Sequence, residues 1–123
     1  MPSFSPRSLE RLATCHLDLQ RLMLEVIKQT DFAVLVGFRN KADQDLAVAE
    51  GHSRTPWPTS KHNKSPALAV DIAPWPIDFD DRERFFKLAG HVLATAHFMG
   101  LSITWGGNWK TLQDLPHFEL RED

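Results

Sequence analysis

The stretch ALAVDIA, at residues 67–73, decides the fold. Its small and branched apolar residues predict a strand, which Pro74 and Pro76 end. In that strand Asp71 shares one face with the alanines, while the branched residues point to the other face. A carboxylate placed here is buried or half buried, and an isolated buried charge is costly. Asp71 therefore needs a cation, hydrogen-bond donors or water beside it, and a metal ion would satisfy it.

Three further segments predict strands. FAVLVGF at residues 32–38 is a short apolar run rich in branched side chains. ITW at 103–105 and HFEL at 117–120 are shorter, and a loop is expected between them at 106–114. The unusual polar residues gather at strand ends, which predicts a site at one rim of the sheet.

Apolar residues at helical spacing predict three helices around these strands. They are expected at residues 5–27, 41–50 and 81–99, the first as one long amphipathic helix. Asn40 is expected to cap the second helix, and Gly51 and Gly100 to end the second and third. Residues 51–66, rich in Pro, Ser and Thr, predict a loop. The expected fold is α+β, a small antiparallel sheet flanked by helices.

Length and composition fit a single domain over residues 1–123. The chain is 42% hydrophobic and 24% charged, and its net charge of −2 gives no positive field for nucleic acid. Arg54, Lys61 and Lys64 nevertheless cluster around His62. This cluster is either a solvated loop or a site that attracts a carboxylate-bearing substrate.

The single cysteine, Cys15, excludes an internal disulfide and a cysteine-rich zinc knuckle. Its apolar helical surroundings predict a buried structural thiol. The N-terminal sequence lacks the pattern of a secretory signal, and no segment is long and apolar enough to span a membrane. We therefore expect synthesis in the cytoplasm, no membrane span, and a monomer.

His62, Asp71 and His117 are the candidate metal ligands. Catalytic zinc takes three protein ligands from His, Asp or Glu and leaves a position for water. Asp114, near His117 and beside a Leu-Pro turn, is the candidate acid and base. Glu119 is the alternative, because on a strand it shares a face with His117.

Taken singly, each of these histidines is also compatible with a hydrogen-bonded structural role. The other four histidines receive no role; three are expected on helices and one in a loop, namely His16, His91, His97 and His52. HExxH, Walker, GxGxxG, GxSxG and paired-cysteine motifs are absent.

Together the motifs SKH at 60–62, AVD at 69–71, WGGNW at 105–109 and DLPHF at 114–118 resemble a known family. It is the zinc peptidases that include L-alanyl-D-glutamate endopeptidases and D-Ala-D-Ala carboxypeptidases, and the phage endolysin branch is most similar. The resemblance covers about residues 32–120, in the family order.

The resemblance implies one catalytic Zn²⁺ held by His62, Asp71 and His117, with Asp114 as the acid and base. It implies that Arg39 lies near the scissile carbonyl and a substrate carboxylate, where a guanidinium would stabilise an oxyanion. It also matches Ser60 to a substrate-holding serine, and Trp105 and Trp109 are expected to form part of the cleft wall, or else to pack in the core. His62 and Asp71 lie farther apart than in the simpler family pattern, so residues 63–68 should contain a longer, outward loop.

Three functions follow as hypotheses. The first is an endolysin that cuts the L-alanyl-D-glutamate bond of peptidoglycan stem peptides, without a wall-binding domain, and that reaches the wall once a separate phage protein opens the membrane. The second is a D-Ala-D-Ala carboxypeptidase or dipeptidase. The third is a non-catalytic, metal-stabilised binding module, against which Asp114 argues because such a module has no use for a base.

Overall fold

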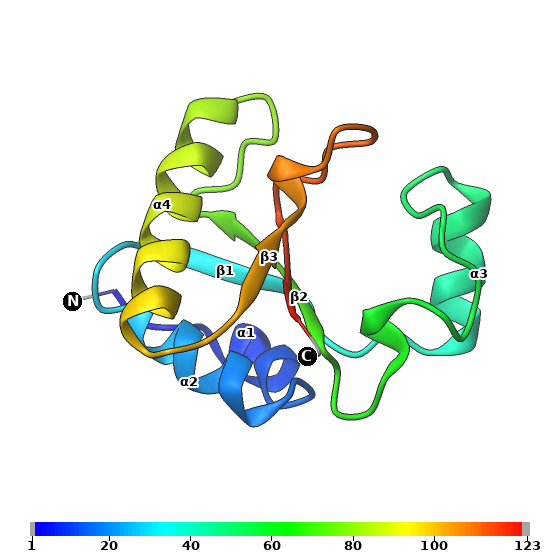
Figure 1. Cartoon of the computed structure of the whole chain (residues 1–123), viewed down its shortest axis with the longest axis horizontal. Helices are drawn as coiled ribbons and strands as arrows, with labels where there is room; N and C mark the ends of the chain where they lie inside the picture. The colour runs from blue at the N-terminus through cyan, green and yellow to red at the C-terminus, as the bar shows by residue number, and fades with distance from the viewer. Residues whose placement is uncertain (1, 122–123) are drawn as a thin grey trace.

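The computed structural model describes residues 2–121, which form one four-stranded antiparallel sheet with helices around it (Figure 1). The strands are β1 (Phe32–Val36), β2 (Ala69–Pro74), β3 (Ile103–Trp105) and β4 (His117–Leu120). Their order across the sheet is β1-β2-β4-β3, so β2 and β4 are central. The predicted fold class is therefore confirmed.

The register of the central strands brings the polar residues together. Asp71 in β2 pairs with His117 in β4 on one side and with Val36 in β1 on the other. A bulge between Val34 and Val36 shifts the β1 register just before this point. Bulges re-aim side chains at the ends of pairing, and here the irregularity adjoins Asp71.

The strand β1 ends two residues earlier than predicted, because the next backbone groups bond elsewhere. The N–H of Phe38 donates to the hydroxyl of Thr14 at 2.8 Å, and that of Arg39 donates to the carbonyl oxygen of His62 at 2.8 Å. A β-carbon at Gly37 would collide with the carbonyl oxygen of Arg11, so this close approach requires glycine.

The single long N-terminal helix predicted from periodicity is wrong. The segment forms two helices, α1 (Pro6–Leu12) and α2 (Leu17–Val26). Between them Cys15 forms a parallel β-bridge with Ala67, and the N–H of His16 donates to the Ala67 carbonyl oxygen at 2.8 Å. His16 is then the N-cap of α2 rather than a helical residue, since its Nδ1 accepts the Asp18 N–H at 3.0 Å.

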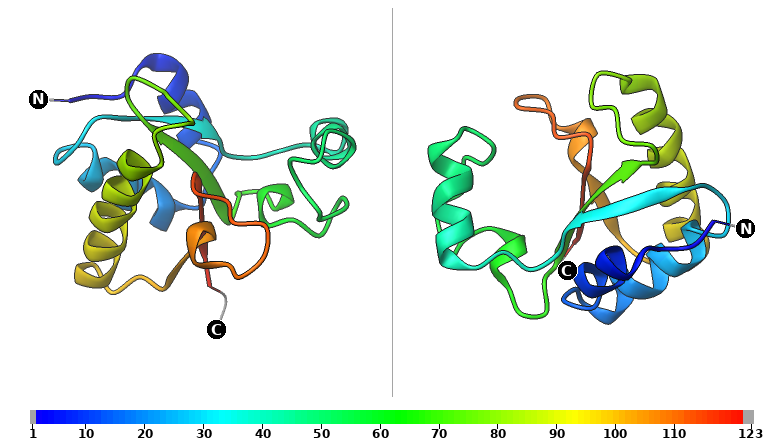
Figure 2. Two further views of the ribbon diagram at one scale, coloured as in Figure 1. Left: turned by 90° about the horizontal axis from the view of Figure 1, so that it is seen from above. Right: turned by 180° about the vertical axis from the view of Figure 1, so that it is seen from behind.

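The other two helices begin after capping side chains, of which only Asn40 was predicted as a cap. Asn40 caps α3 (Lys41–Ala49) by accepting the N–H of Asp43, and Asp81 caps α4 (Arg82–Phe98). Figure 2 shows α3 on the far side of the sheet from α1, α2 and α4. Within residues 2–121, no helix has the length and hydrophobicity that crossing a bilayer would require.

The hydrophobic core lies between one face of the sheet and the helices α1, α2 and α4. Its fully buried members include Leu19, Leu22, Met23, Val26, Val34, Val70, Ile72, Val92 and Phe118. Cys15 belongs to this core as predicted, and burial raises the pKa of its thiol to about 11. The core thus fixes β2 and β4 from behind, and Asp71 lines a cleft on the side away from Val70 and Ile72.

Candidate metal centre

His62 lies in η1 (Lys61–Asn63), a short 3-10 turn inside the segment predicted as a loop. Ser60 begins the turn, and its hydroxyl accepts the His62 N–H at 3.2 Å. The buried imidazole is held by its Nδ1, which lies 2.8 Å from the carbonyl oxygen of Gly37. A carbonyl only accepts, so Nδ1 carries the proton. The other ring nitrogen, Nε2, is directed at Oδ1 of Asp71, 3.1 Å away.

His117 begins β4 directly opposite Asp71. Its Nδ1 lies 3.1 Å from Oδ1 of Asp71, and its Nε2 lies 2.7 Å from Oε1 of Glu119. Glu119 also pairs with Lys61 at 3.1 Å. An ionised carboxylate only accepts, so Nε2 carries the proton that Glu119 binds and Nδ1 is the nitrogen directed at Asp71.

The three predicted ligands therefore converge. One ligand atom each from His62, Asp71 and His117 lies within 4.8 Å of the others. In both imidazoles the second ring nitrogen is held by a hydrogen-bond acceptor, as is typical of metal-binding histidines. Two imidazoles and one carboxylate are donors that suit zinc and other divalent metals. The residues present fit such an ion.

The electrostatics of the cluster also indicate a place for positive charge. Burial would raise the pKa of Asp71, but the charge of His62 and hydrogen bonds from both imidazoles hold it well below its usual range. Burial lowers the pKa of His117, yet hydrogen bonds to Asp71 and Glu119 outweigh this and raise it to about 9. Without metal, protons compensate the buried carboxylate, and a metal ion would have to displace them.

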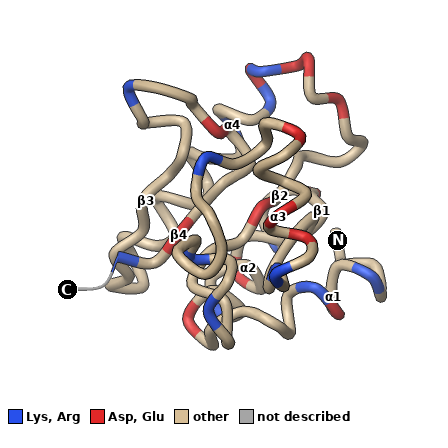
Figure 3. Tube along the Cα trace, turned by 90° about the vertical axis from the view of Figure 1, so that its right-hand side faces the viewer, with Lys and Arg blue, Asp and Glu red and all other residues tan. Residues whose placement is uncertain are grey.

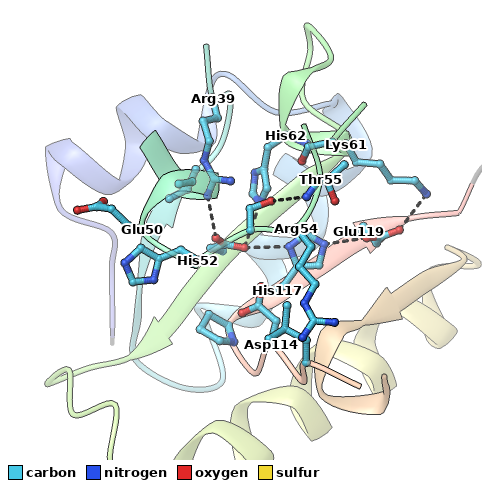
Figure 4. A pocket seen from close by; sticks show the side chains of 18 of the residues that line it. Arg39, Glu50, His52, Arg54, Thr55, Lys61, His62, Asp114, His117 and Glu119 are labelled. Atoms are coloured by element: carbon cyan, nitrogen blue, oxygen red, sulfur yellow. Dashed lines mark hydrogen bonds and ion pairs between the residues drawn. The ribbon is translucent and has the colours of Figure 1, made fainter. Parts of the chain in front are cut away.

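Arg39 lies beside this cluster. Its Nη2 is 3.7 Å from Oδ2 of Asp71 (Figure 4). Its Nη1 donates to Oε1 of Gln44 at 3.2 Å. Gln44, fully buried on α3, also accepts a hydrogen bond from Asn63 at 3.0 Å. The guanidinium therefore borders Asp71 in an orientation that Gln44 sets.

Asp114 enters the cleft where the chain passes close to η2 (Gly106–Asn108). Its N–H donates to the Gly106 carbonyl oxygen at 3.0 Å, and its own carbonyl accepts the His117 N–H at 3.2 Å. A β-carbon at Gly106 would collide with the Asp114 carbonyl, so glycine allows the approach. Burial and the negative charge of Asp71 raise the pKa of the Asp114 carboxyl.

The two candidate bases differ in how they are engaged. Burial raises the pKa of Glu119, but hydrogen bonds from His117 and Lys61 outweigh this and lower it. Asp114 makes no ion pair within residues 2–121. Of these two candidates, Glu119 thus orients a predicted ligand, whereas the Asp114 carboxylate is not engaged in an ion pair in the described part of the chain.

Of the remaining predicted site residues, Trp109 and Ser60 line the cleft and Trp105 does not. Trp105 is only 9% exposed, stacks on Phe118 with ring centroids 6.3 Å apart, and is not among the cleft-lining residues. Trp109 does line the cleft, with its ring centroid 5.1 Å from that of His117. Ser60 also lines it, but its hydroxyl holds the His62 turn. Their roles toward a substrate stay predictions.

A cleft of about 850 Å³ lies over the three ligands. One wall is the arm, by which we mean α3 and residues 50–55, and the other is the segment 109–117. Figure 4 shows His62, His117 and Asp114 pointing into this space, and Figure 3 shows acidic and basic positions intermingled on this side of the molecule. The cleft gives an extended ligand access to the three predicted metal ligands.

A His-Asp-His cluster that could hold a divalent metal, in an open cleft beside a carboxylate that forms no ion pair within the described residues, is typical of metal-dependent hydrolases. The family model described as phage L-alanyl-D-glutamate peptidase matches residues 2–121. The chain belongs to this family.

A solved structure gives the same result. The crystal structure of the L-Ala D-Glu endopeptidase ChiX from Serratia marcescens is similar over 97% of this chain and 90% of that chain. The TM-score is 0.83 and the sequence identity is 32%. The predicted family and the predicted class of enzyme, a peptidoglycan endopeptidase, are therefore confirmed.

Sequence reasoning missed two features of the site. The pairing of Lys61 with Glu119 behind His117 was not predicted, and neither was the buried hydrogen-bond network of Gln44. Glu119 carried a signal, since it shares a strand face with His117. Gln44 carried a weaker one: it lies one helical turn before the small residue Ala47, with which it forms the buried face of α3.

Proposed function

We propose that this protein cleaves the L-alanyl-D-glutamate bond of peptidoglycan stem peptides, with a zinc ion held by His62, Asp71 and His117. The observation that carries the proposal is the convergence of two imidazole nitrogens on the largely buried Asp71 carboxylate in an open cleft. Membership of the peptidase family supports the choice of bond.

Each protein group has a distinct task in this proposal. His62, Asp71 and His117 would hold the zinc ion, which would lower the pKa of a bound water molecule from that of bulk water to about 7. Asp114 accepts a proton from the attacking water and returns it to the amino group of glutamate as the carbon–nitrogen bond breaks. Its raised pKa suits a group that must hold this proton between the two events.

Arg39 supplies positive charge next to Asp71, on the arm side of the centre. A guanidinium there stabilises the negative charge that develops on the alanyl carbonyl oxygen. Glu119 and Lys61 contribute by fixing the His117 ring rather than by moving protons. We propose that the enzyme serves phage-induced lysis and acts on the wall once the membrane has been opened.

The test combines metal analysis with digestion of purified murein. We expect about one zinc per chain and new glutamyl amino termini, and we expect removal of the metal with EDTA to abolish their release. Mass spectrometry of the products distinguishes a cut after L-alanine from loss of a terminal D-alanine. Fully metallated protein that leaves murein peptides intact would refute the proposal.

A further inference from the structure

The substrate in the proposed function carries a negative charge next to the bond that is cut. A glutamate residue has two carboxyl groups, and only one continues the stem peptide. The other is free and ionised at neutral pH unless it is amidated. A cation near the leaving glutamate would attract this carboxylate and so favour binding of the substrate. The following inference rests on the proposed function in this respect.

Three Lys or Arg residues line the cleft: Arg39, Arg54 and Lys61. Arg39 is engaged with Asp71 and with Gln44, and Lys61 is engaged with Glu119. Arg54 has no ion pair within the part of the chain that the structure describes, and Figure 4 shows no partner for it among the residues drawn. It is the lining cation whose charge the protein leaves uncompensated.

The backbone on both sides of Arg54 is anchored. Nε2 of Gln44 donates to the hydroxyl of Ser53 at 3.0 Å and to the carbonyl oxygen of Thr55 at 2.6 Å. The N–H of Thr55 also donates to the Ser53 hydroxyl, at 3.1 Å. The neighbours of Arg54 thus face inward to Gln44, while the exposed Arg54 side chain is directed to the cleft. A guanidinium presented from a fixed backbone binds a carboxylate in a defined position.

We infer that Arg54 binds the free carboxylate of the glutamate on the leaving side of the scissile bond, and so selects acidic over amidated stem peptides. Arg39, whose guanidinium lies beside Asp71, then interacts with the scissile carbonyl rather than with this carboxylate. A guanidinium–carboxylate pair at a partly solvated position should contribute about tenfold to kcat/KM. The effect should lie mainly in KM, because the free carboxylate takes no part in bond cleavage.

The experiment compares two synthetic stem peptides that differ only in this group, one with the free carboxylate and one with a carboxamide. We expect the native enzyme to prefer the acidic peptide by about tenfold in kcat/KM. Arg54→Gln should lose this preference while cleaving the amidated peptide at the native rate, and Arg54→Lys should retain part of it. The matched control is Lys64→Gln, which removes an exposed cation that does not line the cleft.

The outcomes separate the inference from the proposed function. If Arg54→Gln keeps the native preference, or if Arg39→Lys abolishes it instead, the assignment to Arg54 is overturned. Calorimetric binding of both peptides to the Asp114→Asn protein tests the same contact without turnover. There, equal affinity for the two peptides, or no binding of either, also overturns the inference. Failure of the native enzyme to cut either peptide, with selective binding intact, would refute the proposed function alone.

Discussion

Replacing Gln44 with leucine should release the arm from the rest of the molecule without unfolding the sheet. The helix α3 buries only Gln44 and Ala47, while Leu46 and Val48 are exposed, so little apolar packing holds it. Gln44 is fully buried and bonds to Arg39, Asn63, Ser53 and Thr55. Leucine fills a similar volume but offers none of these bonds.

The loss of local stability depends on which of these hydrogen-bond partners are buried and cannot bond to water instead. Arg39 and Ser53 are half buried and rebind to water in the cleft, at little cost. One N–H of the buried Asn63 amide loses its partner, while the other still donates to the Arg39 carbonyl oxygen. The part-buried carbonyl of Thr55 loses its donor as well. A buried group without a partner costs about 1–3 kcal/mol, so the arm should lose about 3 kcal/mol of local stability. At about 1.4 kcal/mol per factor of ten, this is roughly 100-fold in the local opening equilibrium.

Hydrogen exchange on the metal-loaded protein measures this directly. We expect backbone amides of residues 41–55 to exchange roughly 100-fold faster in Gln44→Leu, while amides of β2 and β4 keep their native protection. Val48→Ala, on the exposed side of the same helix and outside the cleft, is the matched control and should change neither. Equal loss of protection in β2 would mean that Gln44 supports the whole fold, and unchanged exchange in α3 would mean that other contacts hold the arm. Either result would refute the reasoning.

Three further predictions concern the metal centre. Asp114→Asn should bind one metal ion as the native protein does yet lose about 10²–10⁴-fold in kcat, because a general acid and base is gone; loss of the metal as well would contradict its assigned role. Glu119→Gln should weaken metal affinity about 10–100-fold, measured by competition with a chromophoric chelator, because the orienting charge behind His117 is removed. In the metal-free protein the folded pKa of His117 is raised to about 9, so the stabilisation is complete below the unfolded value of 6.5 and is lost as the pH rises through 9. Thermal unfolding in EDTA should therefore show a falling Tm between these pH values, and an unchanged Tm would show that the raised pKa is not realised. The lowered pKa of Asp71 acts in the opposite direction, so its contribution is lost as the pH falls below about 4.

The sequence was most informative where one residue was hard to explain in isolation. Asp71 in an apolar strand demanded a cation, and the structure places His62 and His117 at 3.1 Å from its carboxylate. The cap at Asn40 was equally predictable, because its side chain satisfies a backbone N–H of the helix that follows it. Asp81 was expected inside its helix, but it caps α4 in the same way. A helix cap depends only on residues close in sequence, and the cost of an isolated buried charge is large enough to be recognised from one residue.

The features that escaped prediction depend on partners distant in sequence and on modest energies. The position of Trp105 in the core rather than in the cleft follows from stacking on Phe118 and from a hydrogen bond to the Leu115 carbonyl oxygen at 2.8 Å. A Trp-Gly-Gly-x-Trp loop is compatible with either position, since the side chain is both apolar and a donor. The choice is made by the β3–β4 register, which places Trp105 opposite Phe118.

The break in the predicted N-terminal helix and the wide spacing between His62 and Asp71 have the same structural cause, the pairing of residues near Cys15 with Ala67. Ala67 lies in the longer segment between these ligands, yet it is fully buried rather than part of an outward loop. Its N–H donates to the carbonyl oxygen of Thr14 at 2.9 Å, and its own carbonyl accepts the N–H of His16. The backbone must leave the helical conformation around Cys15 to make this pair of bonds, so the helix stops before it despite its apolar periodicity. The longer ligand loop is thereby tied to the core, and the metal ligands at its two ends are held by it.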